Sequence, residues 1–151
     1  MGEKVAIVTG SPNDLPYLDG AKEMLEKFGI AYEVFTLSAH RNLDETVKFA
    51  AAAEENGFDA IIACAGMAAH LPGVIAAKTI LPVIGVPLPT SEIKGMDSLL
   101  AIVQMPSGVP VATMAIGKAG VKNAAIFAAA ILARKSPALR EKLAAFKETL
   151  K

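Results

Sequence analysis

The stretch Ala31-Tyr32-Glu33-Val34-Phe35-Thr36-Leu37 is followed at once by Ser38-Ala39-His40-Arg41, and a helical pattern begins at Asn42. The first run is short and largely apolar and predicts a strand, so a hydroxyl, an imidazole and a guanidinium lie together at a strand-to-helix turn. Arg binds a phosphate or carboxylate with a planar fork of donors, and His gives or takes a proton near neutral pH. The turn is either a ligand site or an ordinary polar start of a helix.

The same strand–turn–helix unit recurs along the chain. Short apolar runs alternate with helical patterns five times, which is typical of a parallel sheet whose strands are covered by helices on both faces. We therefore predict that residues 1–151 form a single α/β domain, a three-layer flavodoxin-like fold with strand order 2-1-3-4-5. The predicted strands are 5–9, 31–37, 59–64, 82–86 and 110–116, and the predicted helices are 15–28, 43–56, 74–79, 95–105, 122–134 and 137–150.

In this strand order the carboxyl ends of the second, first and third strands are neighbours. The turns that follow them are residues 38–41, 10–14 and 65–73. Ligands of open α/β sheets bind at this edge, near the point where the strand order reverses. We therefore expect the three turns to form one site.

The first of these turns reads Gly10-Ser11-Pro12-Asn13-Asp14. Glycine lets the backbone approach a ligand closely, and the following helix offers free N–H groups to an anion. The Gly-Lys-Ser/Thr of a Walker loop and the spacing G-x-G-x-x-G are both missing. Asp14 is predicted either to cap the next helix or to accept hydrogen bonds from ribose hydroxyls. Asn42 is predicted to cap the second helix, in a capping box with Glu45.

The third turn, residues 65–73, consists mostly of small residues around His70. Such a backbone either admits a flat ring or a small molecule, or it packs tightly against the sheet. His40 and His70 are the only histidines, and no H-E-x-x-H is present, so we predict no metal site. Cys64, the single cysteine, lies in an apolar run and is predicted to be a buried, inert thiol.

The composition excludes several classes of partner. Hydrophobic residues make up 53% of the chain, and the formal net charge is zero without any basic run, so nucleic acid is not expected. The longest apolar helical stretch, residues 124–133, is about half the ~20 residues of a membrane span. We expect a cytoplasmic protein without membrane contact, and we expect the apolar excess to be buried between subunits.

Three segments together point to one family. Residues 38–41, Ala68-Ala69-His70-Leu71-Pro72-Gly73 and the stretch from Ser98 to Pro106 resemble, in order and in spacing, the most specific segments of the 5-(carboxyamino)imidazole ribonucleotide mutases of purine biosynthesis. A related class carboxylates aminoimidazole ribonucleotide directly with carbon dioxide. That class typically has Lys after the first His and lacks the second segment, so Arg41 and His70 favour the mutase class.

The resemblance implies a mechanism. The carbamate on the exocyclic nitrogen breaks first, the released carbon dioxide stays trapped, and carbon 4 of the ring then takes it up. One imidazole, that of His40, serves as acid and then as base. His70 positions the carboxyl group, and a small apolar wall keeps the pocket dry. No ATP, metal, biotin or other cofactor is required. The substrate-binding residues that the resemblance implies are Ser11, Ser38 and Arg41 for the 5′-phosphate, Asp14 for the ribose, and Asn13, Gly66, Ala68 and Leu71 along the pocket.

Three positions depart from the family pattern. Asn13 replaces a serine, Asn42-Leu43 replaces Thr-Pro, and Met67 stands where a second glycine is common, which narrows the pocket entrance. The changes at Asn13 and Met67 leave open an alternative, a non-catalytic nucleotide-binding sensor that kept the pocket and lost activity. His40 speaks against it, because a binding module needs no titratable group beside a phosphate.

The resemblance also implies an octamer with sites between subunits. The C-terminal helix, from about residue 137, is expected to pack on a neighbouring subunit, although the tail is short. A transient contact with the synthetase that makes the carboxyamino substrate is a further expectation.

Overall fold

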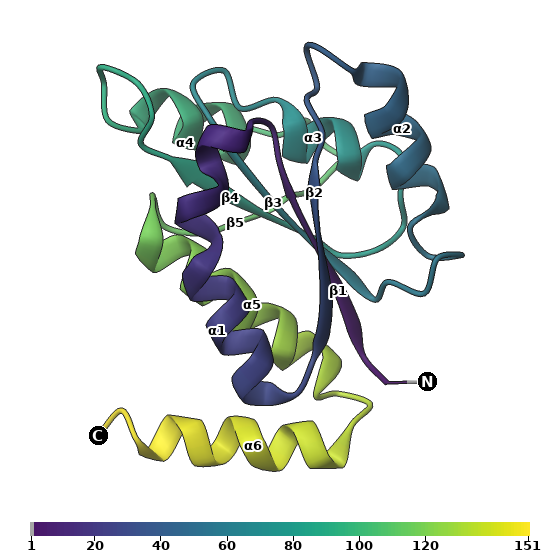
Figure 1. Ribbon diagram of the computed structural model, residues 1–151, viewed down its shortest axis with the longest axis vertical. Helices are drawn as coiled ribbons and strands as arrows, with labels where there is room; N and C mark the ends of the chain where they lie inside the picture. Colours follow the sequence, from purple (N-terminus) through teal and green to yellow (C-terminus); the bar gives the residue numbers. More distant parts are fainter. Residues whose placement is uncertain (1) are drawn as a thin grey trace.

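The computed structural model describes residues 2–151 and contains a five-stranded parallel sheet. The strand order is β2-β1-β3-β4-β5, as predicted. Every neighbouring pair of strands is parallel, so all carboxyl ends meet at one edge (Figure 1). The strands are β1 (Lys4–Thr9), β2 (Ala31–Thr36), β3 (Ala60–Gly66), β4 (Val83–Leu88) and β5 (Ala112–Thr113).

Helices cover the sheet in two layers. On one face α1 and α5 lie side by side, and α2, α3 and α4 cover the other face (Figure 1). Side chains of β1 alternate between the layers: Val5 and Ile7 pack with α1 and α5, whereas Ala6 and Val8 pack with α2 and α3. The helices are η1 (Pro12–Leu18, a 3₁₀ helix), α1 (Asp19–Phe28), α2 (Leu43–Ala52), α3 (Leu71–Ala76), α4 (Met96–Val103), α5 (Lys118–Leu132) and α6 (Pro137–Glu148).

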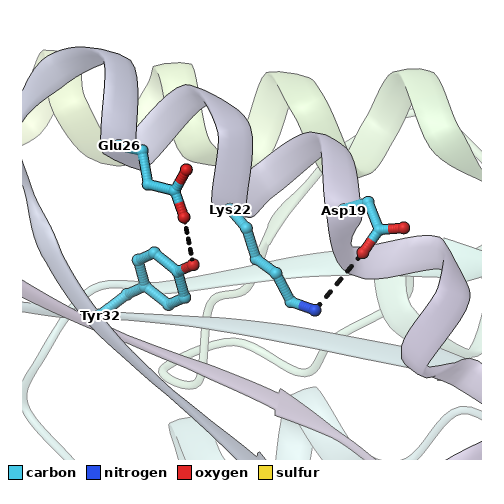
Figure 2. A network of polar contacts seen from close by, with 4 residues as sticks. All are labelled: Asp19, Lys22, Glu26 and Tyr32. Atoms are coloured by element: carbon cyan, nitrogen blue, oxygen red, sulfur yellow. Dashed lines mark hydrogen bonds and ion pairs between the residues drawn. The ribbon is translucent and has the colours of Figure 1, made fainter.

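Strand β2 is covered on both faces but less completely than the inner strands, since Tyr32 and Val34 pack against one core layer and Phe35 packs against the other. This strand lies at the edge of the sheet, and Ala31, Glu33 and Thr36 are exposed. A hydrogen bond connects β2 to α1, because the Tyr32 hydroxyl donates to Glu26 Oε1 at 2.6 Å (Figure 2). A longer ion pair within α1, between Lys22 and Asp19 at 3.4 Å, lies nearby. The bond to Glu26 raises the pKa of Tyr32 above its ordinary value.

The fifth strand is much shorter than the predicted 110–116. The segment beyond it still follows β4, because Met114 N donates to Gly85 O at 2.9 Å and Gly117 N donates to Pro87 O at 2.8 Å. Pro87 has no N–H to return a bond, so a regular ladder cannot continue past Thr113.

Two predicted helix caps are wrong. Ser11, not Asp14, caps the first helical segment, since its hydroxyl accepts a hydrogen bond from Asn13 N at 3.3 Å. Asn42 precedes α2 but makes no side-chain cap, and its Oδ1 accepts from Ser38 N at 2.6 Å instead. The side chains of Ser11 and Asn42 therefore stabilise the turns after β1 and β2.

Helix α6 packs on its own chain. Phe146 is buried against Phe28 of α1 with ring centroids 5.6 Å apart, and Lys142 Nζ donates to Phe28 O at 2.8 Å. Packing of α6 on a neighbouring subunit stays a prediction. In residues 2–151 no helix combines the length and the apolar character that a membrane crossing requires.

Candidate active site

The turns after β1, β2 and β3 converge on one cavity of about 580 Å³ at the carboxyl edge of the sheet. All ten predicted site residues line this cavity, so the predicted convergence is confirmed, while the roles assigned to the residues stay predictions. The lining consists of Gly10, Ser11, Asn13, Asp14, Ser38, Ala39, His40, Arg41, Ala65, Gly66, Met67, Ala68, His70, Leu71 and Thr90.

The two histidines are in direct contact. His40 Nε2 lies 2.7 Å from His70 Nδ1, and the rings are nearly perpendicular, at 82° with centroids 4.9 Å apart. At this distance one nitrogen carries the proton and the other accepts it. Both side chains are exposed to the cavity mouth. The pair can therefore hold a proton and pass it to a ligand, an arrangement that the spacing of 30 residues along the chain did not predict.

The turn at residues 38–41 is held by Ser38. Its hydroxyl oxygen accepts from the backbone N–H groups of His40 and Arg41, at 3.3 and 3.2 Å. Its carbonyl accepts from Thr46 Oγ1 at 3.2 Å, and its N–H is bonded to Asn42. Both lone pairs of the hydroxyl are used, which leaves its proton available for an anion.

Arg41 extends this donor set into the cavity. Its side chain is exposed, and no ion pair found in residues 2–151 involves it. A guanidinium without an internal carboxylate partner is available to a phosphate or carboxylate of a ligand.

Asp14 is a buried wall of the cavity. It is 6% exposed, and its Oδ2 accepts a hydrogen bond from Oγ1 of the fully buried Thr9 at 2.9 Å. Cys64 lies behind this wall and is fully buried, as predicted. Burial raises the pKa of the Cys64 thiol well above its ordinary range, and the charge of Asp14 adds to the effect. Cys64 is therefore a protonated thiol rather than a nucleophile.

Thr90 is the cavity residue that sequence reasoning missed. It follows β4, the next strand in the sheet order, and its exposed side chain lines the cavity beside Gly66. A Cβ added at Gly66 would overlap the Thr90 hydroxyl oxygen, so the glycine makes room for this side chain. Thr90 could have been found from the sequence, because it is a polar residue that follows the fourth predicted strand and so lies at the same sheet edge as the three turns.

Met67 occupies an unusual conformation at the same turn. Its φ of 53° lies in the left-handed region, which glycine adopts far more readily than other residues. Its side chain is 60% exposed at the cavity.

A sequence model of one protein family, described as AIR carboxylase, matches residues 4–151. The chain belongs to this family. Among AIR carboxylase relatives, the N5-carboxyaminoimidazole ribonucleotide mutase of Thermotoga maritima is 54% identical over 98% of this chain and 85% of its own length. The protein of the same name from Pseudomonas aeruginosa is 53% identical over 97% of this chain and 90% of its own length.

Solved structures agree with this family. The crystal structure of Treponema denticola PurE matches with a TM-score of 0.85 at 26% identity, covering 97% of this chain and 90% of that one. A 3-dehydroquinate dehydratase-like protein from Bifidobacterium longum shares the fold alone, with a TM-score of 0.57 at 19% identity. In residues 2–151 no three His, Cys, Asp or Glu side chains are grouped as metal ligands.

Proposed function

We propose that the chain is an isomerase of purine biosynthesis that moves the carboxyl group of N5-carboxyaminoimidazole ribonucleotide from the exocyclic nitrogen to ring carbon 4. The observation that carries the proposal is the His40–His70 pair, 2.7 Å apart in the same cavity as the Ser38 and Arg41 donors. Mutases of that name, more than 50% identical over nearly the whole chain, support the same reaction.

In this proposal the donors at the first two turns hold the nucleotide. Arg41, the Ser38 hydroxyl and Ser11 bind the 5′-phosphate, because the Ser38 proton and the Arg41 fork are free to donate. The Asp14 carboxylate accepts hydrogen bonds from the ribose hydroxyls. Asn13, Gly66, Ala68 and Leu71 line the remainder of the pocket.

The chemistry requires one proton in and one proton out. When the carbamate C–N bond breaks, carbon dioxide leaves and the exocyclic nitrogen gains a proton. Carbon 4 then forms the new C–C bond with carbon dioxide and loses its own proton. His40 gives the first proton and takes the second, and His70 holds the imidazole and the carboxyl group in place. The balance needs no further cofactor.

Two alternatives are less well supported. Direct carboxylation of aminoimidazole ribonucleotide by the same fold is not favoured, because close relatives over the full chain are named as mutases. A non-catalytic sensor would have no use for two contacting histidines in its binding cavity.

The reaction is tested by supplying pure protein with the carboxyamino ribonucleotide and, separately, with aminoimidazole ribonucleotide plus modest bicarbonate. We expect rapid formation of the C4-carboxylated product from the first mixture only. Rapid product from the second mixture alone would identify a direct carboxylase. Nucleotide binding without product from either mixture would identify a sensor.

We further propose that α4 forms an interface between copies in an octamer. Met96, Leu100 and Val103 recur at helical spacing on one side of α4 and are about half exposed, and Ile93 lies just before them at 60% exposure. Exposed apolar side chains grouped in this way mark contact surfaces. Packing of α6 on a neighbour would add to the same assembly.

A cytoplasmic location and a brief contact with the synthetase that makes the substrate are also part of the proposal. A phosphorylated nucleotide does not cross membranes unaided, and a carbamate is labile in water, so both enzymes benefit from sharing one compartment. Cell fractionation and cross-linking of the two proteins test these points.

A further inference from the structure

The mouth of the active-site cavity carries a single exposed, large apolar side chain, that of Met67. The neighbouring wall residues Ala65, Gly66 and Ala68 are small, and the other large apolar residue of the lining, Leu71, is 2% exposed. Met67 is 60% exposed, so its side chain has room to move at the cavity entrance.

The backbone of Met67 makes this placement costly. Within residues 2–151 it is one of two non-glycine residues with positive φ, the other being Lys94. Glycine fits the left-handed region without strain, whereas a side chain there persists only where the surrounding structure holds it. The turn therefore keeps a flexible apolar side chain at a position that glycine would occupy more easily.

The side chain has suitable chemistry for closing over a flat ring. Methionine is unbranched, rotates about three bonds, and its thioether makes favourable contacts with aromatic rings. The rest of the entrance offers polar groups, among them His40, His70 and Thr90, which attract water. An apolar group that folds inward excludes water from the place where carbon dioxide forms.

We propose that Met67 is a movable apolar cap that folds over the substrate ring and holds the released carbon dioxide until carbon 4 takes it up. The inference rests on the proposed function and adds a residue that sets the partition between transfer and escape. If Met67 has this role, removing its side chain lets the released carbon dioxide escape and lets dissolved carbon dioxide from the solvent enter, while the nucleotide still binds.

The test follows the carboxyl carbon. Substrate labelled with carbon-13 in the carbamate is converted in unlabelled bicarbonate, and the label retained in the product and the amount of aminoimidazole ribonucleotide are measured. For Met67→Ala, which removes the cap and keeps a side chain on the strained backbone, we expect escape to rise roughly tenfold. Met67→Leu keeps the apolar bulk and should retain the label much as the wild type does.

A matched control is Ile80→Ala. Ile80 is 86% exposed but lies outside the cavity, so this change should leave label retention unaltered. Equal retention in Met67→Ala and in the wild type would overturn the proposal, as would a rise in KM alone. Wild-type turnover is measured first, since its absence would instead overturn the proposed function and the cap with it.

Discussion

At the scale of single residues, the site depends on how one hydroxyl and two imidazoles divide their hydrogen bonds. The Ser38 hydroxyl oxygen accepts hydrogen bonds from two backbone N–H groups of its own turn, so its proton is available to donate to a ligand. The same turn holds the His40 backbone, and His70, from the turn after β3, contacts the His40 ring. Binding and proton transfer are thus built on adjacent residues.

The first prediction concerns His40. His40→Asn keeps a polar side chain of similar reach but cannot donate and then accept a proton as imidazole does. We expect turnover to fall by at least about 10²-fold, while product binding changes little. Steady-state rates and calorimetric titration with the product measure the two effects. Full activity in this variant would remove His40 from the proton-transfer role.

At the scale of elements, the end of β3 is shaped by a close approach between two neighbouring turns. Gly66 leaves no room for a Cβ because the Thr90 hydroxyl fills that space. Gly66→Ala should lower the free energy of unfolding by about 1–3 kcal/mol, as overpacked sites do. Denaturant titration measures the change.

The control for this prediction is the double variant. Thr90→Ala removes the overlapping oxygen, so Gly66→Ala should cost less in its presence, although the Thr90 Cβ stays 3.1 Å from the new methyl. Gly10→Ala, whose Cβ would meet only Leu37 O at 4.0 Å, should be tolerated. An equal cost of Gly66→Ala with and without the Thr90 hydroxyl would show that this hydroxyl does not limit the space at Gly66.

The contact between α1 and β2 predicts a dependence on pH. Hydrogen bonding to Glu26 raises the pKa of Tyr32 above its ordinary value of 10.0. The neutral phenol therefore stabilises the folded chain below the unfolded pKa, and this contribution is lost as pH rises through the folded value. The stability difference between wild type and Tyr32→Phe should shrink in alkaline buffer, and Tyr17→Phe is the matched control. A difference that is constant with pH would refute this.

The strand order and the meeting of three turns could be predicted from the sequence because both follow from alternation and from the parallel arrangement. The caps could not. Ser, Asp and Asn side chains can each bond to several nearby backbone groups, and only the folded turns show that Ser11 accepts from Asn13 N and that Asn42 accepts from Ser38 N. The contact between His40 and His70 could not be predicted either. The helix was expected to begin at residue 74, whereas α3 begins at Leu71, so His70 lies directly at its start.

At the scale of the whole molecule, the composition and the surface are consistent with assembly. The described chain leaves Ile93, Met96, Leu100 and Val103 substantially exposed around α4. If the proposed octamer forms through this face, Leu100→Lys should reduce it to smaller species in light-scattering measurements, because a buried lysine is poorly tolerated in an apolar interface. Ile80→Lys, an equally drastic change at an exposed residue outside this face, should leave the mass unchanged. A monomeric wild type would contradict the proposed interface.

The cavity is proposed to move a carboxyl group within one ribonucleotide. The most direct measurement is the rate at which pure protein converts N5-carboxyaminoimidazole ribonucleotide, with no bicarbonate added, above the rate in buffer alone. We expect rapid, catalytic formation of the C4-carboxylated isomer. Conversion no faster than in buffer, or product that forms only when aminoimidazole ribonucleotide and bicarbonate are supplied, would contradict this proposal.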